Sequence, residues 1–377
     1  MSIMSLFSFE FLISGSLIFV IASCLGSFFK VVVDRYESNE SFIFRPSCCF
    51  HCKKNLSWWQ NIPIVSFLLL GGRCFFCKTK IDVYCFYSEV VTAFAALAVF
   101  VAGWTKNDCY REITVALVFT MVLILLSMFD LKHRIIPHTI TYSAIIFILI
   151  SRFFLHRETL YLSFAHLGIA FIFMDLLYFF STLIKRFKLN INLVSIPLII
   201  WLVFFHFNQS IYFIFIPLIS YFLLAKLKIN SKLSMASWLI LLLVLLYQFY
   251  KLFFLEHNIE KLHFLFTGVG IIYFVCEILI YFFNSFSNKD KEEVSQPDNT
   301  KVTIGGGDIT VFALISVFLG FKTAFLTLFI ASFLAIISHF TIRAVEASTK
   351  SSKEKHSQYI PFVPFLSVAC FIIMITI

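Results

Sequence analysis

Residues 112–137 read EITVALVFTMVLILLSMFDLKHRIIP. Residues 113–129 carry no charged side chain, and they are numerous enough to cross a hydrocarbon core of about 30 Å as a helix. Asp130 ends the apolar run, and Lys132 and Arg134 follow at once. This stretch predicts a transmembrane helix whose last turn places a carboxylate at a basic face of the membrane.

The rest of the chain repeats this pattern. Its 377 residues are 60% hydrophobic and 14% charged, and the mean hydropathy of +0.92 excludes a soluble globular protein. Long apolar runs favour helices, because a helix satisfies its own backbone hydrogen bonds in lipid. The first run has no basic segment before it and no small-residue cleavage site after it, so we expect a retained helix. The prediction is an all-α polytopic transmembrane protein of about twelve spans, beginning near residues 9, 83, 112, 138, 160, 191, 210, 233, 261, 309, 323 and 359.

The net charge of +9 is concentrated in short connections between the spans. With the N-terminus outside, 22 of the 30 lysines and arginines fall in loops that face the cytoplasm. This distribution follows the positive-inside rule, and it explains the charge by the membrane without a nucleic-acid partner. The cytoplasmic loops in this orientation are 34–82, 131–137, 185–190, 226–232, 286–308 and 343–358.

Residues 34–82 form a cysteine-rich insertion between the first two spans. Cys49 and Cys52 make one C-x-x-C pair, and Cys74 and Cys77 make a second pair after 21 intervening residues. Two such pairs are typical of a four-thiolate zinc site, and zinc would fold a lobe too small to build its own core. We therefore predict a cytoplasmic lobe with structural zinc.

Two disulfides or unligated thiols are the alternative for these cysteines. A lobe that faces the reducing cytoplasm argues against disulfides. Cys48 is adjacent to the first pair, but only Cys49 has the C-x-x-C spacing to Cys52.

Two aspartates are the candidate catalytic residues. Asp130 ends the third span, and Asp308 opens the tenth after Gly305, Gly306 and Gly307. The predicted topology puts both carboxylates at the cytoplasmic face, where one could activate a water and the other, kept protonated, could donate to an oxyanion. The three glycines would let an extended substrate approach closely and would give the loop unusual dihedral angles.

Other roles for the acids stay open. The alternative for Asp130 and Asp308 is that both are ordinary interfacial residues at helix ends. Asp308 is favourable near a helix N-terminus in any case. Asp175 and Glu277 lie deeper in their spans, where we interpret them as structural. A transporter that uses intramembrane acids is the rival function, and it predicts that Asp175 and Glu277 are essential and that the cysteine lobe is dispensable.

Taken in order along the chain, these motifs resemble the bacterial type IV prepilin leader peptidases. The resemblance rests on Gly26-Ser27-Phe28 with Arg35, the two cysteine pairs, Leu56-Ser57-Trp58, Asn61-Ile62-Pro63 with Ser66, Glu89, Asp130 seven residues before Pro137, the G-x-G-D motif Gly305–Asp308, and Ile360-Pro361-Phe362 with Pro364. An intramembrane peptidase of the presenilin type shares G-x-G-D but leaves the cysteine pairs unexplained.

The resemblance implies an inner-membrane aspartic endopeptidase that removes a short basic leader from prepilin or pseudopilin precursors on the cytoplasmic side. Many members also methylate the new N-terminus with S-adenosylmethionine, and Glu89 and Arg35 are candidates for that activity or for support. Lys30 stands where the family usually has Asn, and Thr310 where Lys is usual.

Five segments are expected, of which the fourth is an insertion relative to the family. They are the first transmembrane helix 1–33, the zinc lobe 34–82, a membrane core with the first aspartate 83–155, inserted transmembrane helices 156–260, and a membrane core with the G-x-G-D motif 261–377.

Overall fold

The computed structural model describes residues 9–36, 46–185, 244, 248, 259–286, 305–348 and 360–376. Within these ranges the regular elements are helices, and β pairing is limited to two isolated bridges in the cysteine lobe. The all-α class is confirmed.

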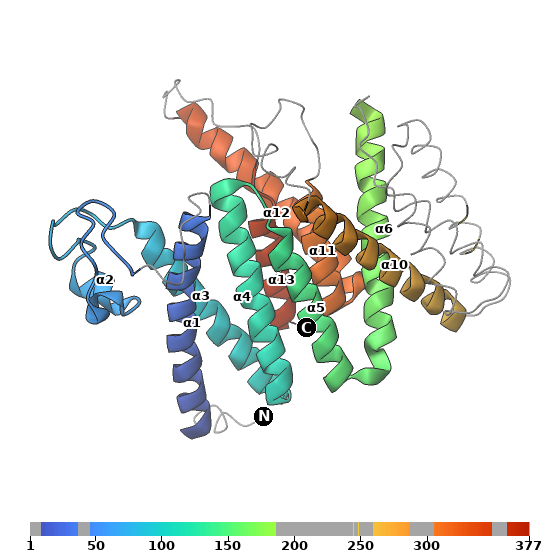
Figure 1. Cartoon of the computed structure of the whole chain (residues 1–377), viewed down its shortest axis with the longest axis horizontal. Helices are drawn as coiled ribbons and strands as arrows, with labels where there is room; N and C mark the ends of the chain where they lie inside the picture. Colours follow the sequence, from blue (N-terminus) through green and yellow to red (C-terminus); the bar gives the residue numbers. More distant parts are fainter. Residues whose placement is uncertain are drawn as a thin grey trace. The chain divides into compact units, whose positions relative to one another are not determined.

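The helices are numbered as in Figure 1. They are α1 Phe9–Arg35, the 3-10 helix η2 Trp58–Asn61, α2 Val65–Leu69, α3 Val83–Lys106, α4 Tyr110–His133, α5 His138–Leu155, the 3-10 helix η3 Arg157–Thr159, α6 Leu160–Lys185, α10 Ile259–Phe286, α11 Gly306–Leu319, α12 Phe321–Ser348 and α13 Val363–Thr376.

Seven helical segments of the described chain are long and apolar enough to cross a membrane, and they lie in α1, α3, α4, α5, α6, α10 and α12. Each begins within a few residues of a predicted span. The spans predicted near 309 and 359 correspond to α11 and α13, apolar helices of 14 residues each. At 1.5 Å per residue these two extend about 21 Å, which is less than the hydrocarbon core. The spans expected near 191, 210 and 233 lie outside the described residues except for residues 244 and 248, so the count of twelve is not confirmed.

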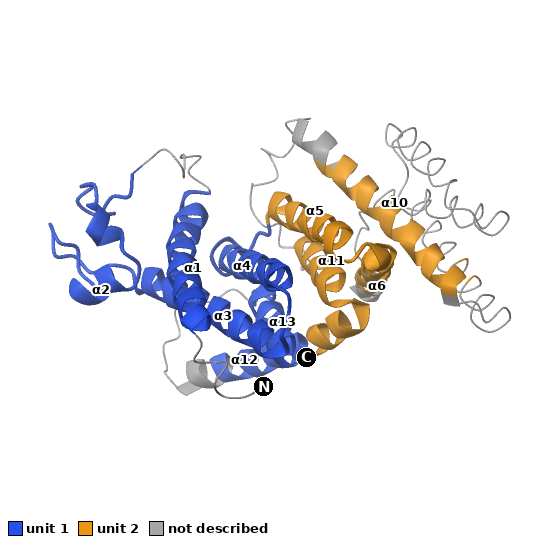
Figure 2. Cartoon of the chain, turned by 90° about the horizontal axis from the view of Figure 1, so that it is seen from below, with its two compact units in different colours: residues 1–136, 330–377 blue, residues 137–329 orange. Residues whose placement is uncertain are grey.

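The chain divides into two compact units, coloured separately in Figure 2. Unit 1 comprises residues 1–136 and 330–377. In it α1 packs along α3, and α13 packs against α4 and α3. Gly26 permits the crossing of α1 and α3, because a Cβ there would lie 2.6 Å from the carbonyl oxygen of Ser88.

Unit 2 comprises residues 137–329, in which α6 packs on α10 and α11 packs on α5 and α6. A Cβ on Gly270 would lie 2.0 Å from the carbonyl oxygen of Phe164, so the two backbones touch where α6 and α10 cross. Phe171 stacks on Tyr273 at 4.4 Å one turn further along. The two helices therefore pack closely along the segments that contain Gly168 and Gly270.

Candidate functional site

Asp130 lies in the last turn of α4, where its side chain is buried. The backbone N–H of Val363 donates to Asp130 Oδ2 at 2.9 Å. Val363 is the first residue of α13, and N–H groups in the first turn of a helix have no intrahelical acceptor. The carboxylate of Asp130 therefore occupies the partly positive N-terminus of a second helix.

The segment Ile360-Pro361-Phe362, which belongs to the last motif of the sequence, leads directly to this contact. Phe362 accepts hydrogen bonds from the N–H groups of Phe365 and Leu366, so α13 begins immediately after Phe362. A second bond, from Ser127 Oγ to Ser367 Oγ at 2.8 Å, joins α4 and α13 one turn away. Two predicted motifs, the first aspartate and the closing segment, are thus brought together.

Asp308 lies in the first turn of α11 and is half-buried. Its Oδ2 accepts a hydrogen bond from the backbone N–H of Gly305 at 3.2 Å, so the side chain caps its own helix. The helix dipole alone favours an acidic side chain at this position, near the N-terminus of the helix.

The expectation of unusual dihedral angles at the glycines is wrong. Gly305 has φ −75° and ψ 146°, and none of Gly305, Gly306 and Gly307 has a positive φ. The turn is an extended N-cap followed by ordinary helix, which any residue can adopt. What the glycines do provide is room among the described residues, of which none lies within 4 Å of a Cβ built on Gly306. A Cβ on Gly305 would meet the Asp308 carboxylate, at 3.4 Å at its nearest.

Asp130 belongs to unit 1 and Asp308 to unit 2, and each unit is described by itself. The pairing of the two carboxylates therefore stays a prediction.

The four predicted ligands of the cysteine lobe come together. The sulfurs of Cys49, Cys52, Cys74 and Cys77 all lie within 4.8 Å of one another, and Cys49 Sγ and Cys77 Sγ are 3.7 Å apart. Tetrahedral zinc with Zn–S bonds of about 2.3 Å needs sulfurs about 3.8 Å apart, so the residues fit such an ion. All ten cysteines, each within the described ranges, are free thiols, and Cys48 is not part of the cluster.

The local sequence builds two similar turns around this cluster. Lys53 and Lys78, each the residue after the second cysteine of a pair, have positive φ angles of 55° and 57°. Each donates its N–H at 3.0 Å to the carbonyl of the first cysteine of its pair. An isolated β-bridge closes each turn, between Cys48 and Asn55 in one and between Arg73 and Lys80 in the other.

The hydrogen bonds of Cys77 favour its thiolate, which is the form that binds metal. The hydroxyl of Thr79 lies 2.9 Å from Cys77 Sγ. This hydrogen bond and that of the Thr79 backbone lower the pKa of the Cys77 thiol to about 6. The thiolate is therefore the main form of Cys77 at neutral pH, as metal coordination requires.

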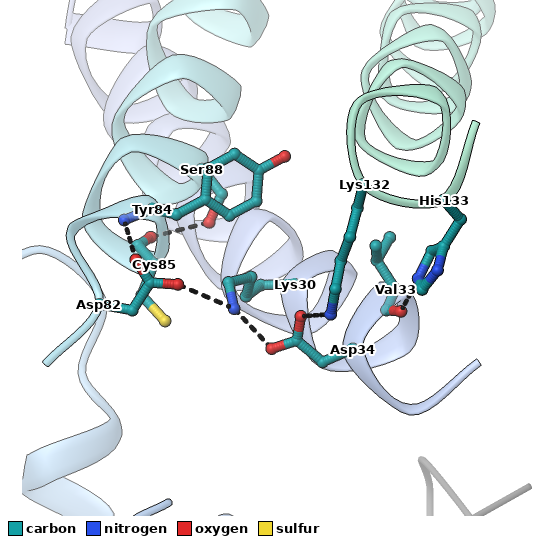
Figure 3. Close-up of polar contacts among 9 residues, drawn as sticks. All are labelled: Lys30, Val33, Asp34, Asp82, Tyr84, Cys85, Ser88, Lys132 and His133. Atoms are coloured by element: carbon teal, nitrogen blue, oxygen red, sulfur yellow. Dashed lines mark hydrogen bonds and ion pairs between the residues drawn. The ribbon is translucent and has the colours of Figure 1, made fainter. Parts of the chain in front are cut away.

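A charge cluster of Lys30, Asp34, Asp82 and Lys132 joins three helices beside the lobe (Figure 3). Asp34 lies 2.5 Å from the amines of both Lys30 and Lys132, and Lys30 is 3.4 Å from Asp82. These residues come from the end of α1, the residue before α3 and the end of α4, two residues after Asp130. Lys30 was noted in the sequence and Asp34 was not, although the i, i+4 spacing of the two residues indicates an ion pair on one helix face.

Replacing Asp34 with Asn should destabilise the protein by about 1–3 kcal/mol, because the buried Lys30 amine loses its nearest counter-charge. A lower midpoint of thermal unfolding in detergent, followed by circular dichroism, would report this. The matched control is Lys132→Gln, which removes a more exposed pair worth about 0.2–1 kcal/mol. An equal or larger effect of Lys132→Gln would contradict the assignment.

Glu89 and Arg35 both attach the lobe to the membrane helices. The buried Glu89 accepts the N–H of Ile64 at 2.7 Å, and Arg35 Nη2 donates to the carbonyl of Pro46 at 3.5 Å. Ile64 has φ 62° and ψ −55°, and the Val65 N–H reaches the Pro63 carbonyl at 2.6 Å, which together define a tight three-residue turn. A positive φ is strained for a β-branched residue, and the bond to Glu89 helps to hold it.

The deeper acids both have phenol partners. The hydroxyl of Tyr273 donates to Asp175, and the hydroxyl of Tyr142 donates to Glu277 at 3.3 Å. These contacts join α6 to α10 and α5 to α10. They agree with the structural interpretation of Asp175 and Glu277 and do not favour a transporter.

Comparison with known proteins found one matching family model and several similar proteins. Residues 20–102 match the family described as the Bacterial Peptidase A24 N-terminal domain. A prepilin leader peptidase/N-methyltransferase from Myxococcus xanthus is 37% identical over 127 residues, which cover 33% of this chain and 36% of the relative. Proteins of the same name from Pseudomonas aeruginosa and Vibrio cholerae are 31% identical over 156 residues and 29% identical over 131 residues.

The last two alignments cover 34% and 33% of this chain and 52% and 50% of the relatives. The chain thus spans about a third to a half of the length of the relatives it matches. No solved structure matches the chain.

Proposed function

We propose, on the premise that residues 20–102 are a bacterial peptidase A24 N-terminal domain, that the chain is an aspartic endopeptidase of the cytoplasmic membrane. It would remove the basic leader from type IV prepilin or pseudopilin precursors. Relatives of the chain are named prepilin leader peptidase/N-methyltransferase. The observation that carries the proposal is that this match coincides with a polytopic helical chain, with the four-cysteine cluster inside the matched segment.

Asp130 and Asp308 are the proposed catalytic pair. One carboxylate would take a proton from a water that attacks the scissile carbonyl, and the other, protonated, would donate to the oxygen as it gains charge. Two neighbouring carboxyl groups favour this single shared proton, because both cannot ionise at low cost. No covalent intermediate is needed.

The contacts of each aspartate fit such a role. The Val363 N–H fixes one oxygen of Asp130, and the Gly305 N–H fixes one oxygen of Asp308. An oriented carboxyl group is the condition for proton transfer in a defined geometry. The space beside Gly305 and Gly306 would admit the backbone of an extended substrate next to Asp308.

Zinc is the metal we propose for the four-cysteine cluster. Cys49, Cys52, Cys74 and Cys77 would hold it, and four thiolates leave no open position for catalysis. Its contribution would be to fold the lobe, with Glu89 and Arg35 as the residues that join the lobe to the membrane helices. We propose that the lobe and both aspartates face the cytoplasm, as the basic loops favour.

Methylation of the new N-terminus with S-adenosylmethionine is the second proposed activity, and its only support is the name of the relatives. Residues 156–260 are proposed to be an insertion between the two parts of the membrane core. Glu89 and Arg35, which contact the lobe, are the residues proposed to carry or support the methylation.

Mass spectrometry of a candidate pilin's mature N-terminus, from cells with and without this protein, tests the proposal. Cells with the protein should yield a pilin that lacks its leader, and cells without it should accumulate the full precursor. An added methyl group on the new N-terminus would establish the second activity in the same spectrum. The same mature N-terminus in both strains would contradict the peptidase assignment.

A further inference from the structure

The lobe carries a short apolar face that no described residue covers. Ile62, Val65, Leu68 and Leu69 are 39%, 47%, 63% and 77% exposed. Val65, Leu68 and Leu69 share one side of α2, at the i, i+3 and i+4 positions of the helix, and Ile62 lies in the turn before it. A run of exposed aliphatic side chains of this kind marks an interaction surface.

The opposite side of α2 is fixed against α3. Phe67 stacks on Phe86 with 4.8 Å between the ring centroids, and the Ile64 N–H is bonded to Glu89. Phe86 and Glu89 lie in the first two turns of α3, a candidate membrane span that begins at Val83. The apolar face is therefore held alongside the end of a span rather than beyond it.

The charge cluster indicates where the membrane surface lies. Lys30 and Asp82 meet at the same ends of α1 and α3 (Figure 3), and charged side chains of this kind belong at the level of the lipid headgroups. Glu89 follows Asp82 by two turns of helix, and Gly26, which contacts α3 at Ser88, precedes Lys30 by one turn. The contact that positions α2 thus lies at or just below the headgroups.

The charged side chains of residues 46–81, the part of the lobe between Arg45 and Asp82, are all of one sign. Residues 46–81 contain no aspartate or glutamate. They contain five basic residues, which are Lys53, Lys54, Arg73, Lys78 and Lys80. Phe50 and Trp58 are 86% and 80% exposed, and Lys53 lies over the Phe50 ring at 4.7 Å. Aliphatic, aromatic and basic side chains together are the composition of segments that lie in the interface of an anionic membrane.

We propose that α2 and the turn before it, residues 62–69, insert into the interface of the leaflet that surrounds α1 and α3, and that the lysines of the lobe bind anionic phospholipid headgroups. The lobe is then docked on the bilayer as well as bonded to α3. Lipid is the occupant that the observations favour, because the face is held beside the end of a candidate membrane span and belongs to a segment whose charged residues are all basic. Neither a second copy of the chain nor a substrate helix would explain why residues 46–81 contain no acidic side chain.

Electron paramagnetic resonance of the full chain in vesicles tests the proposal. Nitroxide is attached to p-acetylphenylalanine at Leu69, because thiol labels would react with the cysteine cluster. Controls are Leu17, exposed on the span in α1, and Asp108, exposed between α3 and α4. The label at Leu69 should be accessible to oxygen and protected from a water-soluble nickel complex. The label at Leu17 should behave in the same way, whereas the label at Asp108 should be accessible to the nickel complex. Adding phosphatidylglycerol to phosphatidylcholine vesicles should raise the ratio of oxygen to nickel accessibility at Leu69.

This rise should be lost when Lys53, Lys54, Lys78 and Lys80 are replaced by Gln, in a variant whose retained metal content shows that the lobe is folded. Nickel accessibility at Leu69 equal to that at Asp108 would overturn the proposal. Protection from both reagents would mean that protein covers the face, and would overturn it too. If adding phosphatidylglycerol does not change the oxygen accessibility at Leu69, the proposed role of anionic lipid is refuted.

Discussion

Replacing Asp308 with Asn, or Asp130 with Asn, is expected to stop leader removal from a co-expressed prepilin. Each variant loses a group that must exchange a proton in the reaction, and loss of a general acid or base lowers rates by about 10²- to 10⁴-fold. The double variant should be no worse than either single one, since the two groups act as a unit. Immunoblots of precursor and mature pilin over time would measure the effect.

The matched control is Asp175→Asn. Asp175 is a buried acid of a membrane helix like Asp130, but its partner is the Tyr273 hydroxyl and it belongs to no predicted catalytic motif. We expect this variant to process the prepilin once its amount in the membrane is equalised. Processing that survives in either catalytic variant would refute the assignment, and processing lost in Asp175→Asn would contradict the structural interpretation of Asp175.

Replacing Cys74 with Ser is expected to release the metal from the lobe. Cys74 is the buried member of the four-sulfur cluster, and a hydroxyl is a far weaker zinc ligand than a thiolate. Because metal binding and folding of such a small lobe are one process, residues 46–82 should then become sensitive to protease. Metal content by mass spectrometry and limited proteolysis in vesicles would report the two effects.

Cys48→Ser is the control for this experiment, since Cys48 adjoins Cys49 but lies outside the cluster. It should keep one zinc per chain. Equal metal content in the Cys48 and Cys74 variants, or zinc absent from the native protein, would contradict the proposed site.

The membrane helices were predictable because their signal is local. An apolar run of about 20 residues has only one stable conformation in lipid, so composition alone gives the start of α1, α3, α5 and α6 to within a residue or two. The four-cysteine cluster was equally accessible, because two C-x-x-C turns impose their own geometry. Three further predicted spans lie outside the described residues except for residues 244 and 248.

The contacts that the sequence did not reveal join distant segments. The bond between Asp130 and Val363 links residues 233 positions apart, and the bond between Lys132 and Asp34 links residues 98 apart. Such pairs depend on how helices pack, which composition and periodicity do not determine. The prediction of unusual dihedral angles at the glycines before Asp308 was also wrong. A glycine can be needed for the space that it leaves rather than for its dihedral angles, and the sequence does not distinguish the two.

An experimental structure of the full chain in lipid nanodiscs, with a substrate peptide bound, would test the pairing of the two aspartates most directly. The quantity to measure is the distance between the carboxyl groups of Asp130 and Asp308. The prediction is that both lie on the same membrane face and within hydrogen-bond reach of a single water beside the scissile peptide bond. Carboxyl groups on opposite faces, or too far apart to flank one peptide bond, would contradict the proposed catalytic pair.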